Sequence, residues 1–189
     1  MEVFILNLKK WHILGALCTI LLGSLVHFTY AWSGKNPVVG SLSAVNESTW
    51  EHLKLLFTPL FLFTLIDYPL YGKEFKNFLP VRFLSILLGM FVIVAAFYTY
   101  SGILGRNFLA ADIATFILGV IAAYCFSCHF LKSGSFSSPE AAAAGKAGLV
   151  LLLVLFILFT FVTPRIGLFK DPVTGGYGIE ANAVQHTAR

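Results

Sequence analysis

Five long apolar stretches, each near the length needed to cross a lipid bilayer, constrain this chain more than any other feature of its sequence. A spanning helix needs roughly 20 apolar residues, and in this chain of 189 residues 58% are hydrophobic and only 12% are charged. We therefore predict an all-α fold with lipid as its solvent, a single domain over residues 1–189 built as an integral membrane bundle of about five transmembrane helices. The predicted helices are residues 11–31, 49–71, 80–100, 107–131 and 146–163, followed by an outer tail at 165–189.

Basic residues near the helix ends predict the orientation of the bundle, because Lys and Arg are retained on the cytoplasmic side. With the N-terminus inside, seven basic residues near helix ends fall on the cytoplasmic side and five on the outer side, the outer ones being Lys35, Lys54, Arg106, Arg165 and Lys170. We predict N-terminus in and C-terminus out, in a multi-pass protein of the cell membrane. The basic residues stand singly rather than in a stripe that follows phosphates, so we predict no nucleic-acid binding.

The second predicted helix carries signals at both of its ends. Ser48, followed three residues later by Glu51, forms a capping box that satisfies backbone N–H groups of the first turn. Near the other end, Asp67 is expected to pair with a basic residue of the connection that follows, and so to anchor the helix. The candidate partners are Lys73, Lys76 and Arg82.

Polar residues gather on the predicted outer side, and ionisable groups inside a bilayer tend to mark function because they are costly. His27 lies at the outer end of the first helix, His52 at the start of the second, and Asp112 near the start of the fourth. We predict an outward-facing polar pocket, capped by the tail, that binds a cation or a small polar ligand. The candidate ligand-binding residues are His27, Tyr30, Asn46, Glu47, Glu51, His52, Asp112, Asp171 and Tyr177.

Within this set, the candidate metal ligands are His27, Glu47, His52 and Asp112. Imidazole and carboxylate groups are usual ligands of zinc, so a divalent metal such as zinc is a candidate cofactor, and the same groups can instead relay protons or hold a polar ligand. The spacing is not specific, because the adjacent Glu51 and His52 point about 100° apart on a helix. Structural interpretations stand beside this one: Glu51 can complete the capping box, and the tyrosines can belong to the interfacial aromatic belt.

A further pattern, Cys125-Phe126-Ser127-Cys128-His129, matches the C-x-x-C-H motif of covalent haem attachment. It lies inside the apolar run of the fourth helix, on the side predicted to be cytoplasmic. Haem attachment requires an accessible segment on the outer face. We expect the match to be accidental and predict no haem, with the cysteines packed in the apolar region and His129 reaching the interface.

Three segments of the chain carry distinctive polar and aromatic motifs. They are His27-Phe28-x-Tyr30-x-Trp32-Ser33-Gly34, Asn46-Glu47-Ser48-x-Trp50-Glu51-His52-x-Lys54 and Asp171-Pro172-x-Thr174-Gly175-x-Tyr177-Gly178. The second segment contains an N-E-S-x-W-E-H motif and the third a D-P-x-T-G-x-Y-G motif. These segments resemble those of an uncharacterised family of small bacterial multi-pass membrane proteins. The resemblance implies a bacterial cytoplasmic membrane and five helices, and it carries no assigned activity.

Three functional hypotheses remain open from the sequence. The preferred one is the outward-facing pocket, with transport as one outcome if the chain forms a homo-oligomer. The second is a membrane-embedded, metal-dependent hydrolase or transferase that acts on a lipid-side substrate, with Glu47 or Glu51 as general base. The third is a non-catalytic subunit of a membrane complex, docked to a partner membrane subunit through small residues of the fourth helix. Those small residues are Ala111, Thr115, Gly119 and Ala122.

Overall fold

The computed structural model describes residues 2–182, and this part of the chain is all-helical. Five helices are long and apolar enough to cross a membrane, as the apolar stretches predict. The helices are α1 (Glu2–Trp32), α2 (Pro37–Gly40), α3 (Thr49–Leu70), α4 (Phe78–Leu104), α5 (Leu109–Ser133) and α6 (Pro139–Phe161). Three 3-10 turns complete the order: η1 (Gly72–Glu74), η2 (Gly167–Phe169) and η3 (Gly178–Asn182).

Two helices begin earlier than their apolar runs. α1 includes the exposed Lys9 and Lys10, because a helix can continue past the apolar boundary when its lysine heads reach water. α6 begins at Pro139, where the Ser138 hydroxyl accepts a hydrogen bond from the Ala141 N–H at 3.1 Å. Proline fits the first helical position, and serine is a favoured N-cap.

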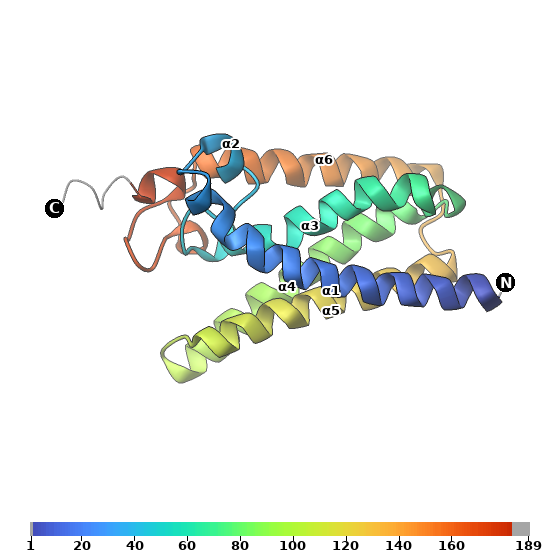
Figure 1. Cartoon of the computed structure of the whole chain (residues 1–189), viewed down its shortest axis with the longest axis horizontal. Coiled ribbons are helices and arrows are strands. Elements are labelled where there is room, and N and C mark those ends of the chain that lie inside the picture. The colour runs from blue at the N-terminus through green and yellow to red at the C-terminus, as the bar shows by residue number, and fades with distance from the viewer. Residues whose placement is uncertain (1, 183–189) are drawn as a thin grey trace.

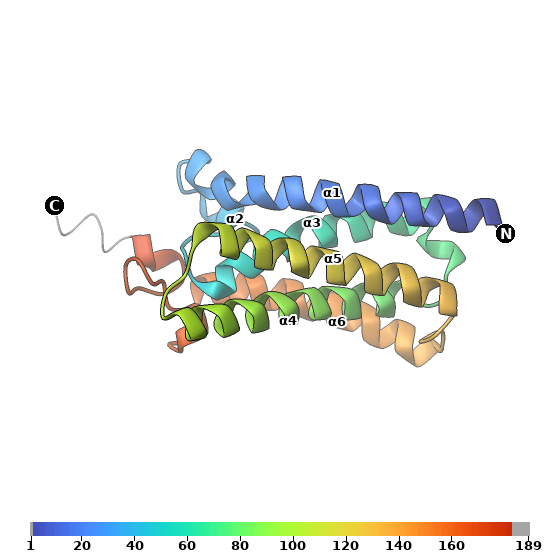
Figure 2. The same cartoon turned by 90° about the horizontal axis from the view of Figure 1, so that it is seen from below.

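The five long helices run side by side along the long axis of the molecule (Figure 1). α3 contacts α1 and α4, α5 contacts α4 and α1, and α6 packs against α4 (Figure 2). The start of α1 lies at one end of the bundle, which we call the amino-terminal end. The opposite end, which we call the tail end, holds α2, the α4–α5 turn and residues 162–182. Which end faces the cytoplasm stays a prediction.

α4 and α5 approach closely where two glycines meet. A Cβ atom on Gly119 would lie 2.8 Å from the carbonyl oxygen of Gly89, so a larger side chain requires the helices to shift. Small residues allow such approaches between membrane helices. Thr115, one turn earlier on the same face of α5, is also buried. At Gly119, the small-residue face that was considered for docking a partner therefore packs against α4 of its own chain.

A buried ion pair between Glu51 and Lys54 joins α3 to the preceding loop and to α6. The two residues are 1% and 0% exposed, and Lys54 Nζ lies 2.6 Å from Glu51 Oε2. Lys54 also donates to the Thr160 hydroxyl at 2.6 Å and to the carbonyl oxygens of Gly40 and Ser43 at 2.9 and 3.2 Å. Charges away from water are stable only when paired and hydrogen-bonded, so this network fixes the loop against the bundle.

The pair also changes the predicted capping box. As expected, the Ser48 hydroxyl accepts a hydrogen bond from the Glu51 N–H, at 3.4 Å. The Glu51 carboxylate, however, accepts from the Val45 N–H and from Lys54. The Ser48 N–H donates instead to the Asn46 side-chain oxygen, at 2.8 Å. The capping box is therefore half-formed, because the buried ammonium draws the carboxylate inward.

Replacing Lys54 with Met should destabilise the fold by about 3–5 kcal/mol, because the Glu51 carboxylate is then buried without its counter-charge. Unfolding of the purified protein in detergent measures this loss. The double variant Lys54→Met/Glu51→Leu removes both charges and should recover much of the stability. A single variant as stable as the double one would contradict the role given to the pair.

Candidate functional site

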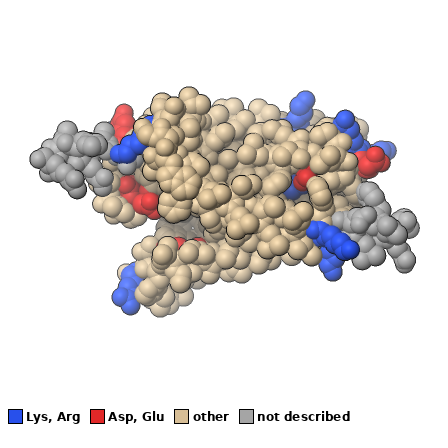
Figure 3. Space-filling view, in the orientation of Figure 1, with Lys and Arg blue, Asp and Glu red and all other residues tan. Residues whose placement is uncertain are grey.

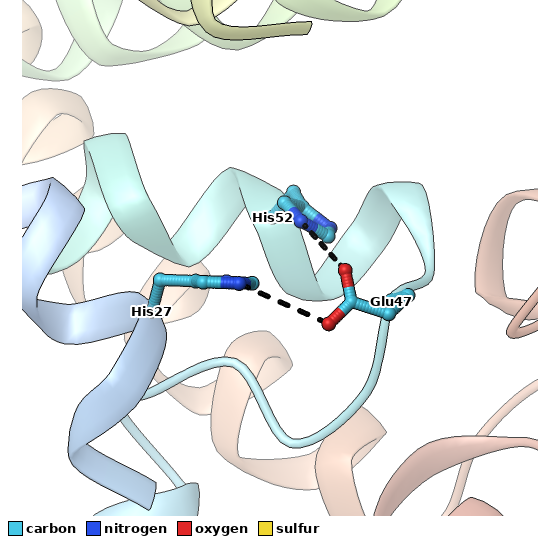
Figure 4. Close-up of side chains that lie close together, drawn as sticks. All are labelled: His27, Glu47 and His52. Atoms are coloured by element: carbon cyan, nitrogen blue, oxygen red, sulfur yellow. Dashed lines mark ion pairs between the residues drawn. The ribbon is translucent and has the colours of Figure 1, made fainter. Parts of the chain in front are cut away.

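Three side chains from different segments meet at the tail end: His27 from α1, Glu47 from the loop before α3, and His52 from the first turns of α3 (Figure 4). His52 Nε2 lies 3.4 Å from one Glu47 oxygen, and His27 Nε2 lies 3.8 Å from the other. The two imidazole centroids are 5.2 Å apart. One potential ligand atom from each side chain falls within 4.8 Å of the other two, and we call the trio the His–Glu cluster.

Hydrogen bonds determine which ring nitrogens face the centre of the cluster. His52 Nδ1 lies 2.9 Å from the Ser48 carbonyl oxygen, so it donates its proton there and leaves Nε2 directed at Glu47. His27 Nδ1 is buried and has no hydrogen-bond partner among the described residues. The His27, His52 and Glu47 side chains are 26%, 35% and 48% exposed, so the cluster is reachable from outside the bundle.

The residues on either side of Glu47 hold it in place. The Asn46 side-chain oxygen accepts from the Ser48 N–H, a local turn that asparagine favours. Asn46 Nδ2 donates to the Gly178 carbonyl oxygen at 2.8 Å, which ties the loop to the tail. Ser48 then caps α3. Glu47 thus stands between two anchored residues, and its carboxylate projects towards the histidines (Figure 4).

Three other predicted site residues serve as supports of the tail end. Tyr30 is buried, and the Cβ position of Gly40 in α2 lies 3.0 Å from its ring. Asn46 joins the loop to the tail at Gly178. Glu51 points inward to Lys54. They lie near the His–Glu cluster without adding a ligand atom to it.

The two predicted residues of the tail lie within the tail's own fold. Asp171 is buried, and its carboxylate accepts hydrogen bonds from the Val173 N–H and the Thr174 hydroxyl, at 3.0 and 2.5 Å. Tyr177 pairs with Lys170 through an isolated antiparallel bridge. The tail therefore forms a compact turn, and its contact with the site runs through the loop before α3.

Asp112 lies beside the His–Glu cluster rather than in it. Its carboxylate accepts hydrogen bonds from the Tyr100 hydroxyl and from Asn107 Nδ2, both within the α4–α5 hairpin. The hairpin diverges from the rest of the bundle at the tail end (Figure 1), and Figure 3 shows a hollow there with acidic atoms inside it. Asp112 is close enough to act electrostatically on the His52 ring.

The C-x-x-C-H segment lies in the continuous helix α5, in the half nearer the amino-terminal end. Cys125 and His129 are exposed on the outside of the bundle, and Cys128 is half-buried. Together with Lys132 and Ser133 they line an open depression. This segment is separate from the His–Glu cluster.

Sequence reasoning missed the role of Lys54 and Thr160. Lys54 was counted among the outer basic residues near helix ends, whereas it is buried against Thr160 of α6. A signal was available, because Glu51 and Lys54 stand three residues apart and so share one face of a helix. A charged pair on the same face of an apolar helix indicates an internal ion pair.

When His52 is protonated, both its ring nitrogens carry protons, and the hydrogen bond from its Nε2–H to Glu47 holds the pKa of this carboxyl below its ordinary value. A group whose pKa is lower in the folded state adds stability above its unfolded pKa, and that stability is lost as the pH falls through the folded pKa. The contribution of Glu47 is therefore present at neutral pH and is lost in acid.

Glu47→Gln should accordingly lower stability at neutral pH and make no difference in acid. Because 48% of the Glu47 side chain is exposed, the expected difference is at most about 1 kcal/mol. Unfolding temperatures of both proteins, compared from about pH 7 to about pH 3, test it. A difference that persists undiminished in acid would show that the carboxylate charge is not responsible.

Comparisons with curated proteins and with solved structures find no similar chain. One family model matches residues 1–179, nearly the whole chain, and its description assigns no activity. This confirms the resemblance to an uncharacterised family. The chain belongs to the family of unknown function DUF6512.

Proposed function

We propose that the His–Glu cluster binds a divalent transition-metal ion of the zinc type, and that the protein captures this cation at the membrane surface. The observation that carries the proposal is the convergence of His27, Glu47 and His52, whose ligand atoms lie within 4.8 Å of one another. They come from α1, from the loop before α3 and from the first turns of α3. Imidazole and carboxylate are the ligand types that zinc accepts.

The distances support a tetrahedral ion. Zinc bonds of about 2.0–2.1 Å place tetrahedral ligand atoms roughly 3.3 Å apart. The ligand atoms lie within 4.8 Å of one another, and the 3.4 and 3.8 Å contacts reach different Glu47 oxygens, so binding one ion requires the side chains to move together by up to about 1.5 Å. The hydrogen bond from His52 Nδ1 to the Ser48 carbonyl oxygen is the kind of second interaction that orients a metal-binding histidine.

Two histidines and one glutamate leave a fourth coordination position open. That position suits a water molecule or an exchangeable ligand, because the three side chains are partly exposed. Asp112 adds negative charge nearby, which favours a cation over an anion. The hydrolase alternative loses support at Glu51, because Lys54 occupies that carboxylate and a general base must be free to take a proton.

The proposed location follows from the basic residues and the apolar helices. Five helices long enough to cross a membrane support a multi-pass membrane protein. We propose that the tail end faces outward from a bacterial cytoplasmic membrane, on the motif resemblance and on the bias of basic residues, six to four once the buried Arg82 and Lys54 are left out. The His–Glu cluster would then meet cations from outside the cell.

The purified protein, stripped with a chelator and titrated with zinc, should bind one ion per chain. His52→Ala should weaken binding by at least about 100-fold, since it removes a ligand where loss of an orienting partner alone costs 10–100-fold. Calorimetry with elemental analysis measures both. His129→Ala, an exposed histidine on α5, is the matched control and should bind as wild type does. Equal zinc binding by wild type and His52→Ala would disprove the site.

Asp112→Asn tests the nearby carboxylate separately. Zinc affinity should fall by about 10-fold, because a negative charge that is not a direct ligand is lost from the surroundings of the ion. The same titration measures it. Asparagine keeps hydrogen-bonding capacity towards Tyr100, so the unfolding temperature should change little. If this variant binds zinc as tightly as wild type does, the role of Asp112 is only to hold the α4–α5 turn.

A further inference from the structure

A second group of polar side chains surrounds the buried Arg82 and Asp67 near the amino-terminal end. We call Trp11, Asp67, Tyr71 and Arg82 the arginine cluster; Tyr71 is half-buried and Trp11 is exposed. Arg82 is 1% exposed, and its Nη2 lies 2.5 Å from Asp67 Oδ2 and 3.1 Å from the Tyr71 hydroxyl. Tyr71 and Trp11 each donate a hydrogen bond to Asp67, at 3.0 and 3.1 Å. Asp67 thus finds its predicted basic partner in Arg82.

The guanidinium of Arg82 is only partly satisfied. Its Nε and Nη1 are buried and have no acceptor among the described residues. A guanidinium carries five N–H groups, and the two on Nη2 serve Asp67 and Tyr71. Phe78, whose ring centroid is 5.1 Å from Cζ, offers a π face but no lone pair. Buried polar groups in native proteins nearly always have a partner, either protein or water. We therefore infer that the remaining N–H groups of Arg82 also have one.

Polar groups continue from the arginine cluster towards the middle of the membrane. His12 follows Trp11 in α1, and its ring packs edge-on against that of Tyr124, with centroids 6.0 Å apart. His12 Nε2 lies 3.1 Å from the Ser127 hydroxyl. The Tyr124 hydroxyl lies 2.8 Å from that of Thr19, which is near the middle of the span Leu8–Trp32.

The packing between this region and the tail end is tight and apolar. A Cβ atom on Gly23 would lie 2.7 Å from the Phe116 ring and 2.3 Å from the Leu55 carbonyl oxygen. Gly23 stands between Thr19 and His27 along α1. The polar side chains around Arg82 are therefore separated from the His–Glu cluster by close contact of three helices.

We propose that the amino-terminal half of the bundle encloses a hydrated chamber, in which water accepts hydrogen bonds from Arg82 and links it to the Tyr124 hydroxyl. An internal water typically makes about three hydrogen bonds to such buried groups. Water fits better than an anion, because Asp67 already neutralises Arg82 and a further negative charge would be uncompensated in lipid. The chamber extends from the amino-terminal half of the bundle towards mid-membrane, and it does not depend on metal binding.

Radiolytic footprinting of the wild-type protein in detergent tests the chamber, because bound water converted to hydroxyl radicals oxidises the side chains beside it. Tyr124 is 5% exposed and Phe57 is 0% exposed, so both are shielded from bulk solvent. If water is bound, Tyr124 should be oxidised at least about five-fold faster than Phe57, which lies in the apolar core. Equal rates at the two residues would overturn the proposal.

The double variant Arg82→Met/Asp67→Leu identifies what holds the water. It removes both charges together, so no lone ion is left buried. Tyr124 oxidation should then fall towards the Phe57 rate, while zinc binding at the other end stays as in wild type. Tyr124 oxidation unchanged from wild type would overturn the assignment of the water to Arg82. The wild-type comparison decides the proposal even if the double variant does not fold.

Discussion

The burial of the Lys54 ammonium is the constraint on which the tail end of the bundle depends. A charged amine that is 0% exposed in a membrane-spanning helix must find acceptors within the protein. Glu51 is one turn away, but the two carbonyl oxygens belong to Gly40 at the end of α2 and to Ser43 in the loop, and the hydroxyl belongs to Thr160 of α6. Satisfying one cation therefore places the loop before α3 and joins two helices.

Because of that placement, neighbouring residues at the start of α3 have different structural roles. Glu51 and Lys54 share the inward face of α3, because three residues are close to one helical turn. His52 is rotated by about 100° from Glu51 and turns towards α1 instead. Glu47 precedes the helix, so the direction of its side chain is not set by helical geometry. The turn formed by Asn46 directs the Glu47 carboxylate towards the histidines. The cluster thus forms from residues that a simple helical face does not unite.

These contacts explain which features of the fold and of the His–Glu cluster could be predicted from the sequence. Hydropathy is a local property, so the five spans follow from it directly. Polar residues at one membrane level must lie near one another, which is why His27, Glu47 and His52 were among the predicted candidates. To predict that Glu51 and Asp171 lie outside the cluster, one must know where their side chains point. Those directions depend on partners that are distant in sequence. The basic-residue count treats every Lys near a helix end as interfacial, and so it misplaced Lys54.

The two buried cations are satisfied to different degrees, and their shapes explain why. An ammonium concentrates three donors at one point, where two carbonyls, a hydroxyl and a carboxylate reach Lys54. A guanidinium spreads five donors around a plane, and the helices around Arg82 supply acceptors on one edge only. The tail end is consequently held by direct protein bonds, which suits ligands that must be fixed before a metal arrives. At the amino-terminal end, the remaining donors of Arg82 need small acceptors that can move into place. This need suits bound water rather than a fixed ligand site.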